Sequence, residues 1–263
     1  MSDPKCNICG SCNYNNYLKF KEGRKVVICN NCRAFRTMPY LLMDYSEQEF
    51  YCEHYLKNER IFKGFAETLV KLAKRYKREG KLLDIGCSVG FVLEEASKAG
   101  FEAEGVELNK KAAEIVSEKG FDVKSLPLKE IAHEKEVFDV VILNHILEHI
   151  FEVNDFMKDV RGLIKKDGIL IIGVPNHNSL VARLYKASWY GWGKGEHVWH
   201  FDKNSLKNVL TGNGFKIMEC IQNSQYYSFS RSFRKNIMTC IAKIGNMLEI
   251  GDQLIAVSKK IQE

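Results

Sequence analysis

The fold of this chain follows from one short stretch, Leu82-Leu83-Asp84-Ile85-Gly86-Cys87-Ser88-Val89-Gly90. An apolar run of this length, ended by turn residues and followed by a helical pattern, predicts a buried strand, a tight loop and a helix. The glycines Gly86 and Gly90 allow a sharp turn and let a ligand lie against bare backbone. In an open parallel sheet such a loop lies at the carboxyl edge of the strands, where ligands bind.

The same order of strand, loop and helix recurs along the chain. Short apolar runs alternate with helical stretches that end in glycine, and these runs lie at 82–85, 103–106, 137–143 and 169–174. This alternation predicts an α/β fold, with a parallel sheet covered by helices on both faces. Further strands are expected at 215–221 and 252–258, and further helices at 58–79, 203–213 and 232–248.

Length and composition describe a globular protein rather than a fibrous or disordered one. The chain has 263 residues, of which 45% are hydrophobic and 27% charged, enough for one sizeable core and a small appendage. Its longest uncharged apolar stretch, 169–175, is far shorter than the roughly 20 residues of a membrane span, and residues 1–7 lack the apolar core of a signal peptide. A cytoplasmic protein without a transmembrane segment is therefore expected.

The N-terminal segment carries two Cys-x-x-Cys pairs, Cys6 with Cys9 and Cys29 with Cys32. Two such pairs, separated by nineteen residues, predict a zinc ribbon in which each pair supplies two thiolates to a structural Zn²⁺. Iron-sulfur or redox use is the alternative, and Cys12 is expected to stay free. Because the ribbon has few apolar residues, it should depend on its metal for folding, and it should unfold alone when the metal is removed.

These features divide the chain into three parts. We expect the zinc ribbon over 1–38, a linker and leading helix over 39–80, and the main domain over 81–263, with a helical insertion at about 222–251. Residues 1–38 hold seven Lys or Arg and two acidic residues, so +5 of the net charge of +6 lies there. This uneven charge favours a local anionic partner over a surface that coats nucleic acid.

The glycine loop departs from two other ligand-binding patterns. A nicotinamide fingerprint starting at Gly86 needs glycine where Ser88 and Phe91 stand, and a phosphate loop needs Gly-Lys directly after Gly90. The pattern that remains, Asp-x-Gly-x-x-x-Gly, resembles that of class I S-adenosylmethionine (SAM) methyltransferases, and the resemblance extends from about residue 81 to residue 259. It implies a Rossmann-like, mostly parallel sheet of seven strands, with SAM as the cofactor.

The resemblance also implies which residues contact SAM. Glu107, at the end of the second strand, would hold the ribose hydroxyls with its carboxylate, as acidic residues do in dinucleotide enzymes. Asp84 would orient the loop and the amino-acid end of SAM, and Leu126 would lie near the adenine. The other cofactor contacts that it implies are Gly86, Cys87, Ser88, Gly90, Leu108 and Asn144.

A second motif follows the fourth strand, Asn144-His145-Ile146-Leu147-Glu148-His149. It resembles the Glu-x-x-Glu-His of ubiquinone-pathway O-methyltransferases and small-RNA 2'-O-methyltransferases, which binds a divalent cation. His145 replaces the first Glu, a change that weakens Mg²⁺ binding and favours a nitrogen-tolerant metal. Structural capping and a second divalent metal, held by Glu148, His149 and His197, are both open. A zinc-protease interpretation fails because His145 adjoins a strand instead of lying inside a helix.

A third motif is Gly195-Glu196-His197-Val198-Trp199-His200-Phe201-Asp202. It resembles the segment after strand five of the same broad group, in which a His faces the substrate. His197 can take up a hydroxyl proton, and His145 and Glu196 complete the candidate catalytic set. Sugar C-methyltransferases carry a comparable Glu-His pair, so the methylated atom stays open. The tryptophans nearby, which either face a substrate or pack the loop, are Trp189, Trp192 and Trp199.

Together these motifs predict a SAM-dependent methyltransferase that acts on a hydroxyl of a small molecule or of a cell-surface sugar or glycan precursor. Lipid-linked and nucleotide-linked substrates are both compatible, and the basic amphipathic pattern at 232–248 fits either a membrane surface or internal packing. The alternatives are a sugar C-methyltransferase, a quinone-type O-methyltransferase, an RNA methyltransferase whose basic ribbon tracks phosphates, and a non-catalytic SAM-binding adaptor. No DNA partner is expected, and RNA is less favoured than a small molecule.

Overall fold

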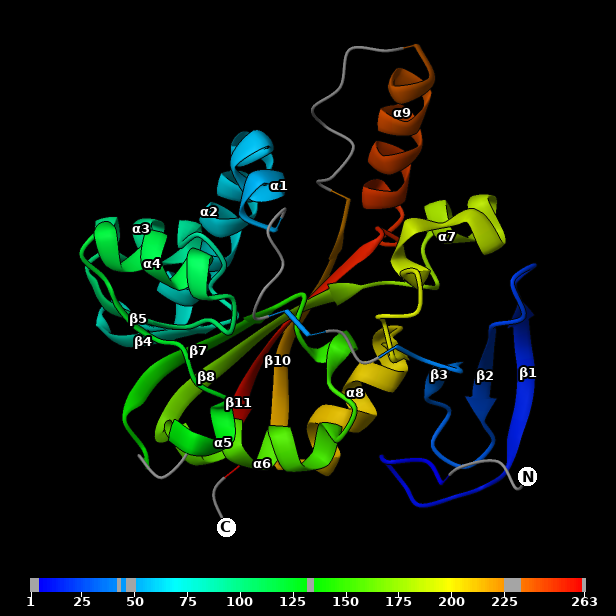
Figure 1. Cartoon of the computed structure of the whole chain (residues 1–263), viewed down its shortest axis with the longest axis horizontal. Helices are drawn as coiled ribbons and strands as arrows, with labels where there is room; N and C mark the ends of the chain where they lie inside the picture. The colour runs from blue at the N-terminus through cyan, green and yellow to red at the C-terminus, as the bar shows by residue number, and fades with distance from the viewer. Residues whose placement is uncertain (1–4, 42–43, 46–50, 132–134, 225–232, 262–263) are drawn as a thin grey trace.

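The computed structural model describes residues 5–41, 44–45, 51–131, 135–224 and 233–261. Its centre is a seven-stranded sheet in the order β10-β11-β8-β7-β4-β5-β6 (Figure 1). The strands are β4 (Gly80–Ile85), β5 (Phe101–Val106), β6 (Asp122–Lys124), β7 (Phe138–Asn144), β8 (Ile164–Pro175), β10 (Phe215–Asn223) and β11 (Gln253–Lys260). All six predicted strands are present, and β6 is an addition.

The directions of the strands explain why several loops meet at one edge. β4 is parallel to β5 and β7, β5 is parallel to β6, and β7 is parallel to β8. Only β11 runs the other way, antiparallel to both β8 and β10. The predicted Rossmann-like, mostly parallel sheet is thereby confirmed. The sequence pattern missed β6 because Val123 is its only apolar residue.

Helices cover both faces of the sheet because successive side chains of each strand point to opposite faces. Leu82 belongs to a core cluster with Leu69, whereas its neighbour Leu83 belongs to another with Met157. The helices on the first face are α2 (Glu59–Tyr76), α3 (Phe91–Lys98) and α4 (Lys110–Glu118), with α1 (Tyr51–Lys57) leading into them. Those on the second are α5 (Leu128–Ile131), α6 (Val153–Leu163) and α8 (Lys203–Gly212).

The N-terminal cysteine segment shares a second sheet with the main domain. Its strands β1 (Tyr14–Lys19), β2 (Lys25–Cys29) and β3 (Phe35–Met38) are antiparallel, and β3 also pairs with the two-residue strand β9 (Trp199–His200). Asn7 contacts α6 as well, because its side chain donates to Glu152 and its carbonyl accepts from Asn154. The prediction that this segment unfolds alone does not allow for these contacts, because its unfolding would also remove the strand partner of β9.

The tryptophan-rich loop packs against the second sheet. Trp189 and Trp192 are buried in one cluster with Val26, Ile28 and Phe35, and Trp199 is buried in the main core. The sequence left two roles open for these rings, contact with a substrate or packing of the loop, and in the structure they pack the loop. The loop also contains α7 (Leu180–Tyr185) and two short 3-10 turns at Lys186–Ser188 and Tyr190–Trp192.

The last helix, α9 (Phe233–Met247), matches the helix predicted at 232–248 and lies beside α7 (Figure 1). Ile241 packs against the core cluster of the tryptophan loop, whereas Ile244 and Leu248 are exposed. The amphipathic pattern also rests on side chains that lie outside the described residues, those of Phe233, Ile237 and Met238. Within the described part of the chain, no helix is long and apolar enough to cross a membrane.

Candidate active site

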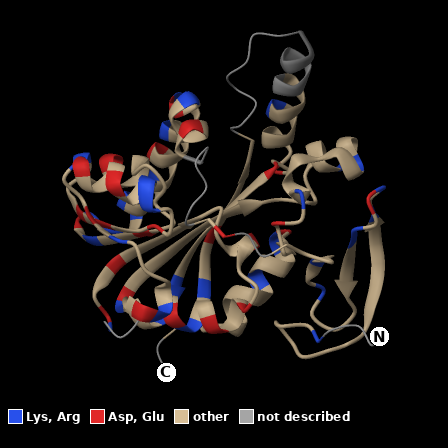
Figure 2. Cartoon of the chain, viewed as in Figure 1, with Lys and Arg blue, Asp and Glu red and all other residues tan. Residues whose placement is uncertain are grey.

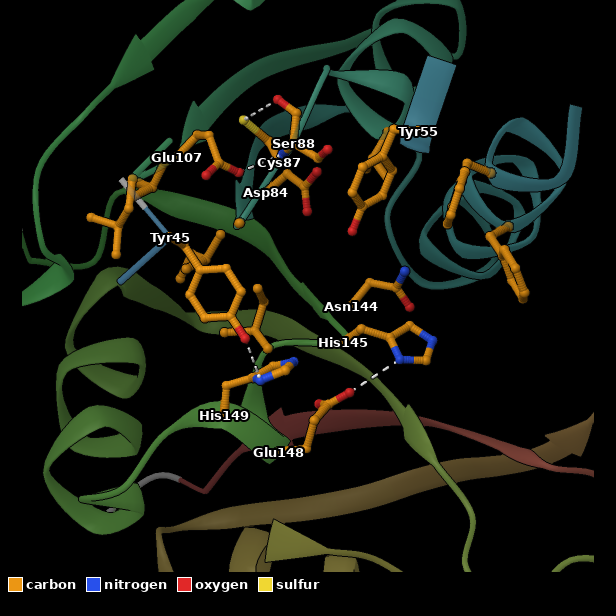
Figure 3. A pocket seen from close by; sticks show the side chains of 18 of the residues that line it. Tyr45, Tyr55, Asp84, Cys87, Ser88, Glu107, Asn144, His145, Glu148 and His149 are labelled. Atoms are coloured by element: carbon orange, nitrogen blue, oxygen red, sulfur yellow. Dashed lines mark hydrogen bonds and ion pairs between the residues drawn. The ribbon is translucent and has the colours of Figure 1, made fainter. Parts of the chain in front are cut away.

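A cavity of about 720 Å³ opens at the carboxyl edge of the seven-stranded sheet. It has two halves (Figure 3). The carboxylate half consists of Asp84, residues 86–88 and Glu107, and the histidine half consists of His145, Glu148, His149 and His197. Tyr45, from the linker, lies between them.

The cavity lining includes most of the predicted site residues. Those assigned to the cofactor that line it are Asp84, Gly86, Cys87, Ser88, Glu107, Leu108, Leu126 and Asn144. The predicted catalytic residues that line it are His145, Glu196 and His197. Gly90 does not line the cavity but precedes the first turn of α3, where its left-handed backbone (φ 88°) ends the loop.

The glycine loop folds back over the end of β5. The amide groups of Gly86 and Cys87 both donate to the carbonyl of Val106, at 2.7 and 3.1 Å. Gly86 has φ 77°, a backbone that glycine adopts without strain and that a β-branched residue does not. An added Cβ at Gly86 would lie 2.1 Å from Cδ1 of Ile146, so the loop, Ile146 and the cavity wall fit together closely.

Glu107 is held so that its carboxylate faces the cavity. Oε2 accepts the amide hydrogen of Ser88 at 2.7 Å, and Oε1 accepts that of Asn109 at 2.8 Å. Burial raises the pKa of Glu107, although these amide hydrogen bonds oppose the shift. Each carboxylate oxygen keeps a second lone pair, so the pair of oxygens can still accept from a diol.

Asp84 lies deeper, at the end of β4, and is almost fully buried. Burial, together with the negative charge of Glu107, raises the pKa of Asp84 to about 8. A carboxylate in this position becomes stable in its ionised form when a cation lies beside it. The carboxylate half thus offers one acceptor for a diol and one for a cationic group.

In the histidine half, His145 bridges two partners. Its Nδ1 lies 3.1 Å from Oε1 of Glu148, and its Nε2 lies 3.2 Å from the amide nitrogen of Gln253. Because a carboxylate only accepts, Nδ1 carries the proton and Nε2 accepts from Gln253. His145 also has a left-handed backbone (φ 57°), an uncommon conformation that clusters at functional sites.

Glu148 is a buried carboxylate with one unpartnered oxygen. Its side chain is 1% exposed, and Oε2 has no hydrogen-bond partner among the described residues. Burial alone would raise the pKa of Glu148, but the hydrogen bond from His145 and the nearby imidazoles lower it to about 2. The group therefore stays ionised at neutral pH, with one oxygen available to a cation.

His149 and His197 are oriented in the same way. Nδ1 of His149 lies 3.1 Å from the carbonyl of Glu196 and 2.9 Å from the Tyr45 hydroxyl, and Nδ1 of His197 lies 2.8 Å from the carbonyl of Gly191. A carbonyl only accepts, so both rings carry their proton on Nδ1 and a lone pair on Nε2. Burial lowers the pKa of His149 to about 4 despite the charge of Glu148, which keeps this ring neutral.

The three groups form a cluster with metal-ligand geometry. Ligand atoms of Glu148, His149 and His197 all lie within 4.8 Å of one another. His145 is not among them, and its Nδ1 donates a hydrogen bond to Oε1 of Glu148 instead. Glu196 is turned into its own loop, where Oε2 accepts the amide hydrogen of Lys194 at 2.6 Å.

Several lining residues were not predicted. Gln253 and Asp252 stand at the start of β11, and the Tyr190 hydroxyl donates to Asp252 at 2.8 Å. They reach the cavity because β11 lies beside β8, an order that the sequence does not reveal. Beside Tyr45, an aromatic wall from the leading helices completes the lining, with Tyr55, Phe62 and Phe65.

The cavity lining is rich in acidic side chains. Its lining contains five carboxylates, those of Asp84, Glu107, Glu148, Glu196 and Asp252. Among the described residues that line it there is no Lys or Arg. A ligand with several negative charges would find no counter-charge here.

The second cluster of ligand atoms belongs to the N-terminal cysteines. Sγ of Cys6 lies 3.6 Å from that of Cys32, Sγ of Cys9 lies 3.6 Å from that of Cys29, and all four lie within 4.8 Å of one another. A tetrahedron with Zn–S bonds of about 2.3 Å has edges of about 3.8 Å. The four thiols therefore fit a tetrahedral metal ion, whereas Cys12 is exposed and outside the cluster.

Comparisons with known proteins match this chain to methyltransferases. The methyltransferase domain family matches residues 56–219 of the chain. A ubiquinone biosynthesis O-methyltransferase of Pelagibacter ubique is 28% identical in an alignment 209 residues long, which covers 69% of this chain and 84% of that protein.

Two crystal structures share the fold. A SAM-dependent methyltransferase from Archaeoglobus fulgidus aligns with a TM-score of 0.58 and 20% identity, over 79% of this chain and 99% of that one. The 1,6-didemethyltoxoflavin-N1-methyltransferase of Burkholderia thailandensis, with bound 1,6-didemethyltoxoflavin and S-adenosylhomocysteine, aligns with a TM-score of 0.56 and 12% identity. That match covers 94% of this chain and all of the other.

Proposed function

Because the chain belongs to the methyltransferase domain family, we propose that this SAM-dependent methyltransferase methylates a hydroxyl group of an uncharged small molecule with a flat ring. The observation that carries the proposal is the single cavity in which a carboxylate half faces a histidine half without any lining Lys or Arg among the described residues. The first half suits the cofactor, and the second suits an acceptor hydroxyl.

SAM would lie in the carboxylate half. Glu107 would accept hydrogen bonds from the ribose diol, and Asp84 would pair with the amino group, while Leu126 and Leu108 would border the adenine. SAM supplies an electrophilic methyl group on its sulfonium sulfur. The chain contributes by holding the acceptor oxygen in line with that methyl group, which is where most of the rate gain in such a reaction arises.

The affinity for SAM should depend on pH. A positively charged amino group next to Asp84 favours the ionised carboxylate, so binding releases the proton that Asp84 carries below pH 8. The affinity should therefore rise with pH, by roughly tenfold for each unit below pH 8. Above that pH it should fall again, because an α-amino group has an ordinary pKa of about 8 and loses its charge. Calorimetry between pH 6 and 9 measures this. An affinity that is constant or falls between pH 6 and pH 8 would show that Asp84 does not pair with the amino group.

His197 is our candidate for the base. Its Nδ1 donates to Gly191, so Nε2 is the nitrogen that can take the proton of the acceptor hydroxyl. With SAM bound, the methyl group would pass to that oxygen, the electron pair of the broken carbon–sulfur bond would stay on sulfur, and His197 would take up the proton. His145 and Glu148, which are hydrogen-bonded to each other, would lie beside the acceptor.

The lining limits the acceptor to certain chemical classes. Nucleotide-linked sugars and RNA carry phosphates, and they are normally bound by Lys, Arg or helix N-termini. Five acidic side chains, with no Lys or Arg among the described residues of the lining, disfavour such acceptors, whereas the aromatic wall favours a flat ring. The Pelagibacter ubique relative, named for ubiquinone biosynthesis, supports the quinone-type alternative. Figure 2 shows Lys and Arg distributed along the N-terminal segment. Arg36 is buried and Arg24 pairs with Glu22, but Lys19, Lys21 and Arg33 are exposed, so RNA stays an alternative acceptor for the turnover assay below.

A divalent ion is the second candidate for the histidine half. Glu148, His149 and His197 would hold it through one oxygen and two nitrogens, a donor set that suits Zn²⁺ or a transition metal better than Mg²⁺. Two observations fit: the unpartnered Oε2 of Glu148 and the donation of both Nδ1–H groups to carbonyls, as metal-binding histidines do. Such an ion would lower the pKa of a bound hydroxyl, which makes a separate base unnecessary.

A turnover assay with methyl-labelled SAM tests the function. Neutral catechol and hydroquinone compounds, a nucleotide-linked sugar and a structured RNA would be offered in parallel, with products identified by mass spectrometry. We expect a methyl ether from the neutral ring compounds. Transfer to the nucleotide sugar or the RNA alone, or to a carbon atom, would contradict the proposal.

For the N-terminal cysteines we propose a structural Zn²⁺ held by Cys6, Cys9, Cys29 and Cys32, with the ribbon over 1–38, the linker and leading helix over 39–80 and the main domain over 81–263. The separations of the Sγ atoms support this donor set. Four thiolates favour Zn²⁺ because the ion is borderline soft and accepts a tetrahedron without preference from its d electrons.

Elemental analysis should find one zinc ion per chain in the wild type. Cys29→Ser should lose nearly all of it, because metal binding supplies most of the folding free energy of so small a unit. Since β3 shares a sheet with β9, the variant should also become sensitive to protease near residues 193–200. Cys12→Ser is the matched control, since this exposed thiol lies outside the cluster, and it should keep its zinc. Iron in place of zinc, or no metal, would contradict the assignment.

A further inference from the structure

The strand β9 joins the ribbon directly to the histidine half of the cavity. Val198, which follows His197, accepts the amide hydrogen of Thr37 at 2.9 Å and donates its own to the carbonyl of Glu148 at 2.8 Å. One residue therefore connects the ribbon strand β3 on one side with the turn that carries Glu148 and His149 on the other.

A buried side-chain contact strengthens this connection. Oγ1 of Thr37 lies 2.7 Å from Nε2 of His200, and both residues are almost completely shielded from solvent, Thr37 at 0% and His200 at 3%. A buried hydrogen bond of this kind is costly to lose, because the remaining partner cannot turn to water. Thr37 thus contacts the segment on both sides of Trp199, by its backbone and by its side chain.

Two more bonds reach the residues before His197. The amide of Leu41 donates to the carbonyl of Gly195 at 2.8 Å, and Nη1 of Arg24 donates to the carbonyl of Gly193 at 3.3 Å. The N-terminal part of the chain therefore contacts residues 193–200 at four places that lie on both sides of His197.

We infer that Thr37 is a positioning residue of the active site: it holds β9 against the ribbon and thereby sets the place of His197 relative to Glu148 and His149. The inference rests on the role proposed for His197. β9 has two residues, and its one strand neighbour in the described sheets is β3. On its other side it is held by Nε1 of Trp199, which donates to the carbonyl of Ile150 at 2.9 Å, and by the bond of Val198 to Glu148. The ribbon therefore helps to position the active site. Such positioning matters because a displacement of a reacting group by about 1 Å can cost 10²-fold in rate.

Thr37→Val provides the test. Valine has the same shape and keeps the backbone bond to Val198, but it removes the hydroxyl that contacts His200. We expect kcat to fall roughly tenfold or more, with the Kd for SAM and the zinc content unchanged. Thr37→Ser, which restores the hydroxyl, should recover most of kcat. Thr211→Val is the matched control, because its hydroxyl bonds only to carbonyls within α8, and it should keep wild-type kcat.

Hydrogen–deuterium exchange supplies a measurement that needs no substrate. The amide hydrogens of residues 196–201 should exchange several times faster in Thr37→Val than in the wild type, and at the wild-type rate in Thr211→Val. Unchanged exchange would overturn the link between Thr37 and β9, whether or not the wild type methylates a hydroxyl. Faster exchange with wild-type kcat would overturn the link to catalysis. A loss of zinc or of SAM binding in Thr37→Val would also overturn the proposal, because the effect would then be general unfolding.

Discussion

Replacing His197 by alanine is expected to lower kcat by roughly 10²–10⁴ while the Kd for SAM stays unchanged. The reason lies in the division of the cavity. His197 belongs to the histidine half, with its Nδ1 fixed on Gly191, whereas Asp84 and Glu107 occupy the other half. Steady-state kinetics and calorimetry on one preparation measure both quantities.

Two further measurements separate the possible roles of His197. If it is the base, added imidazole should restore part of the activity of His197→Ala, and the active wild type should contain no metal ion besides the one held by the four cysteines. If it is a metal ligand, the active wild type should contain a second metal ion per chain, and His197→Ala should lose that ion while it keeps the zinc of the cysteines. Glu196→Gln is the comparison, since the glutamine oxygen can still accept from Lys194, and its kcat should stay within severalfold. If His197→Ala kept the wild-type kcat, His197 would have neither role, and catalysis would depend only on the positioning of the acceptor.

The second large effect is expected for Gly86→Val, which should weaken SAM binding by at least 100-fold. The left-handed backbone at φ 77° does not suit a β-branched residue. The new side chain would also meet Ile146, so either the loop or Ile146, both of which line the cavity, must shift. For comparison, Glu107→Ala removes a charge-assisted contact, worth about 1.5 to 3 kcal/mol, and should weaken binding about tenfold or more.

The control for Gly86→Val is Gly120→Val. Gly120 has nearly the same backbone, φ 85°, but an added Cβ there would meet nothing within 4 Å, and the residue does not line the cavity. Both variants carry similar backbone strain, and Gly86→Val adds the contact with Ile146, so both should unfold at a lower temperature than the wild type, while only Gly86→Val loses SAM. Equal SAM affinity in the two variants would remove Gly86 from the cofactor site.

The parts of the fold that could be predicted are those that local sequence determines. An apolar run such as 82–85 followed by Gly86 predicts its own strand and turn, because strand length, turn chemistry and burial all depend on neighbouring residues. The same holds for Cys6, Cys9, Cys29 and Cys32, whose spacing brings two thiols together at each knuckle. These positions did come together in the structure.

Contacts between distant segments could not be predicted in this way. Gln253 lines the cavity because β11 inserts between β8 and β10, and no pattern within residues 252–258 reveals that order. The pairing of β3 with β9 was missed for a similar reason, since Trp199-His200 is too short to show alternation. Glu196 shows a different limit: its residue type suggested catalysis, but a backbone amide two residues away determines where its carboxylate points.

The pairing of β3 with β9 also affects how the chain reaches its native state. Phe35 pairs with His200, so the open edge of the ribbon has no partner until the ribosome has made most of the protein. Bringing such distant segments together carries an entropy cost before any contact rewards it, which makes this a late step. Until then β3 is an exposed edge strand, the kind of surface on which nascent chains associate with one another. The yield of folded protein should therefore depend on how soon residues 199–200 are translated after the ribbon.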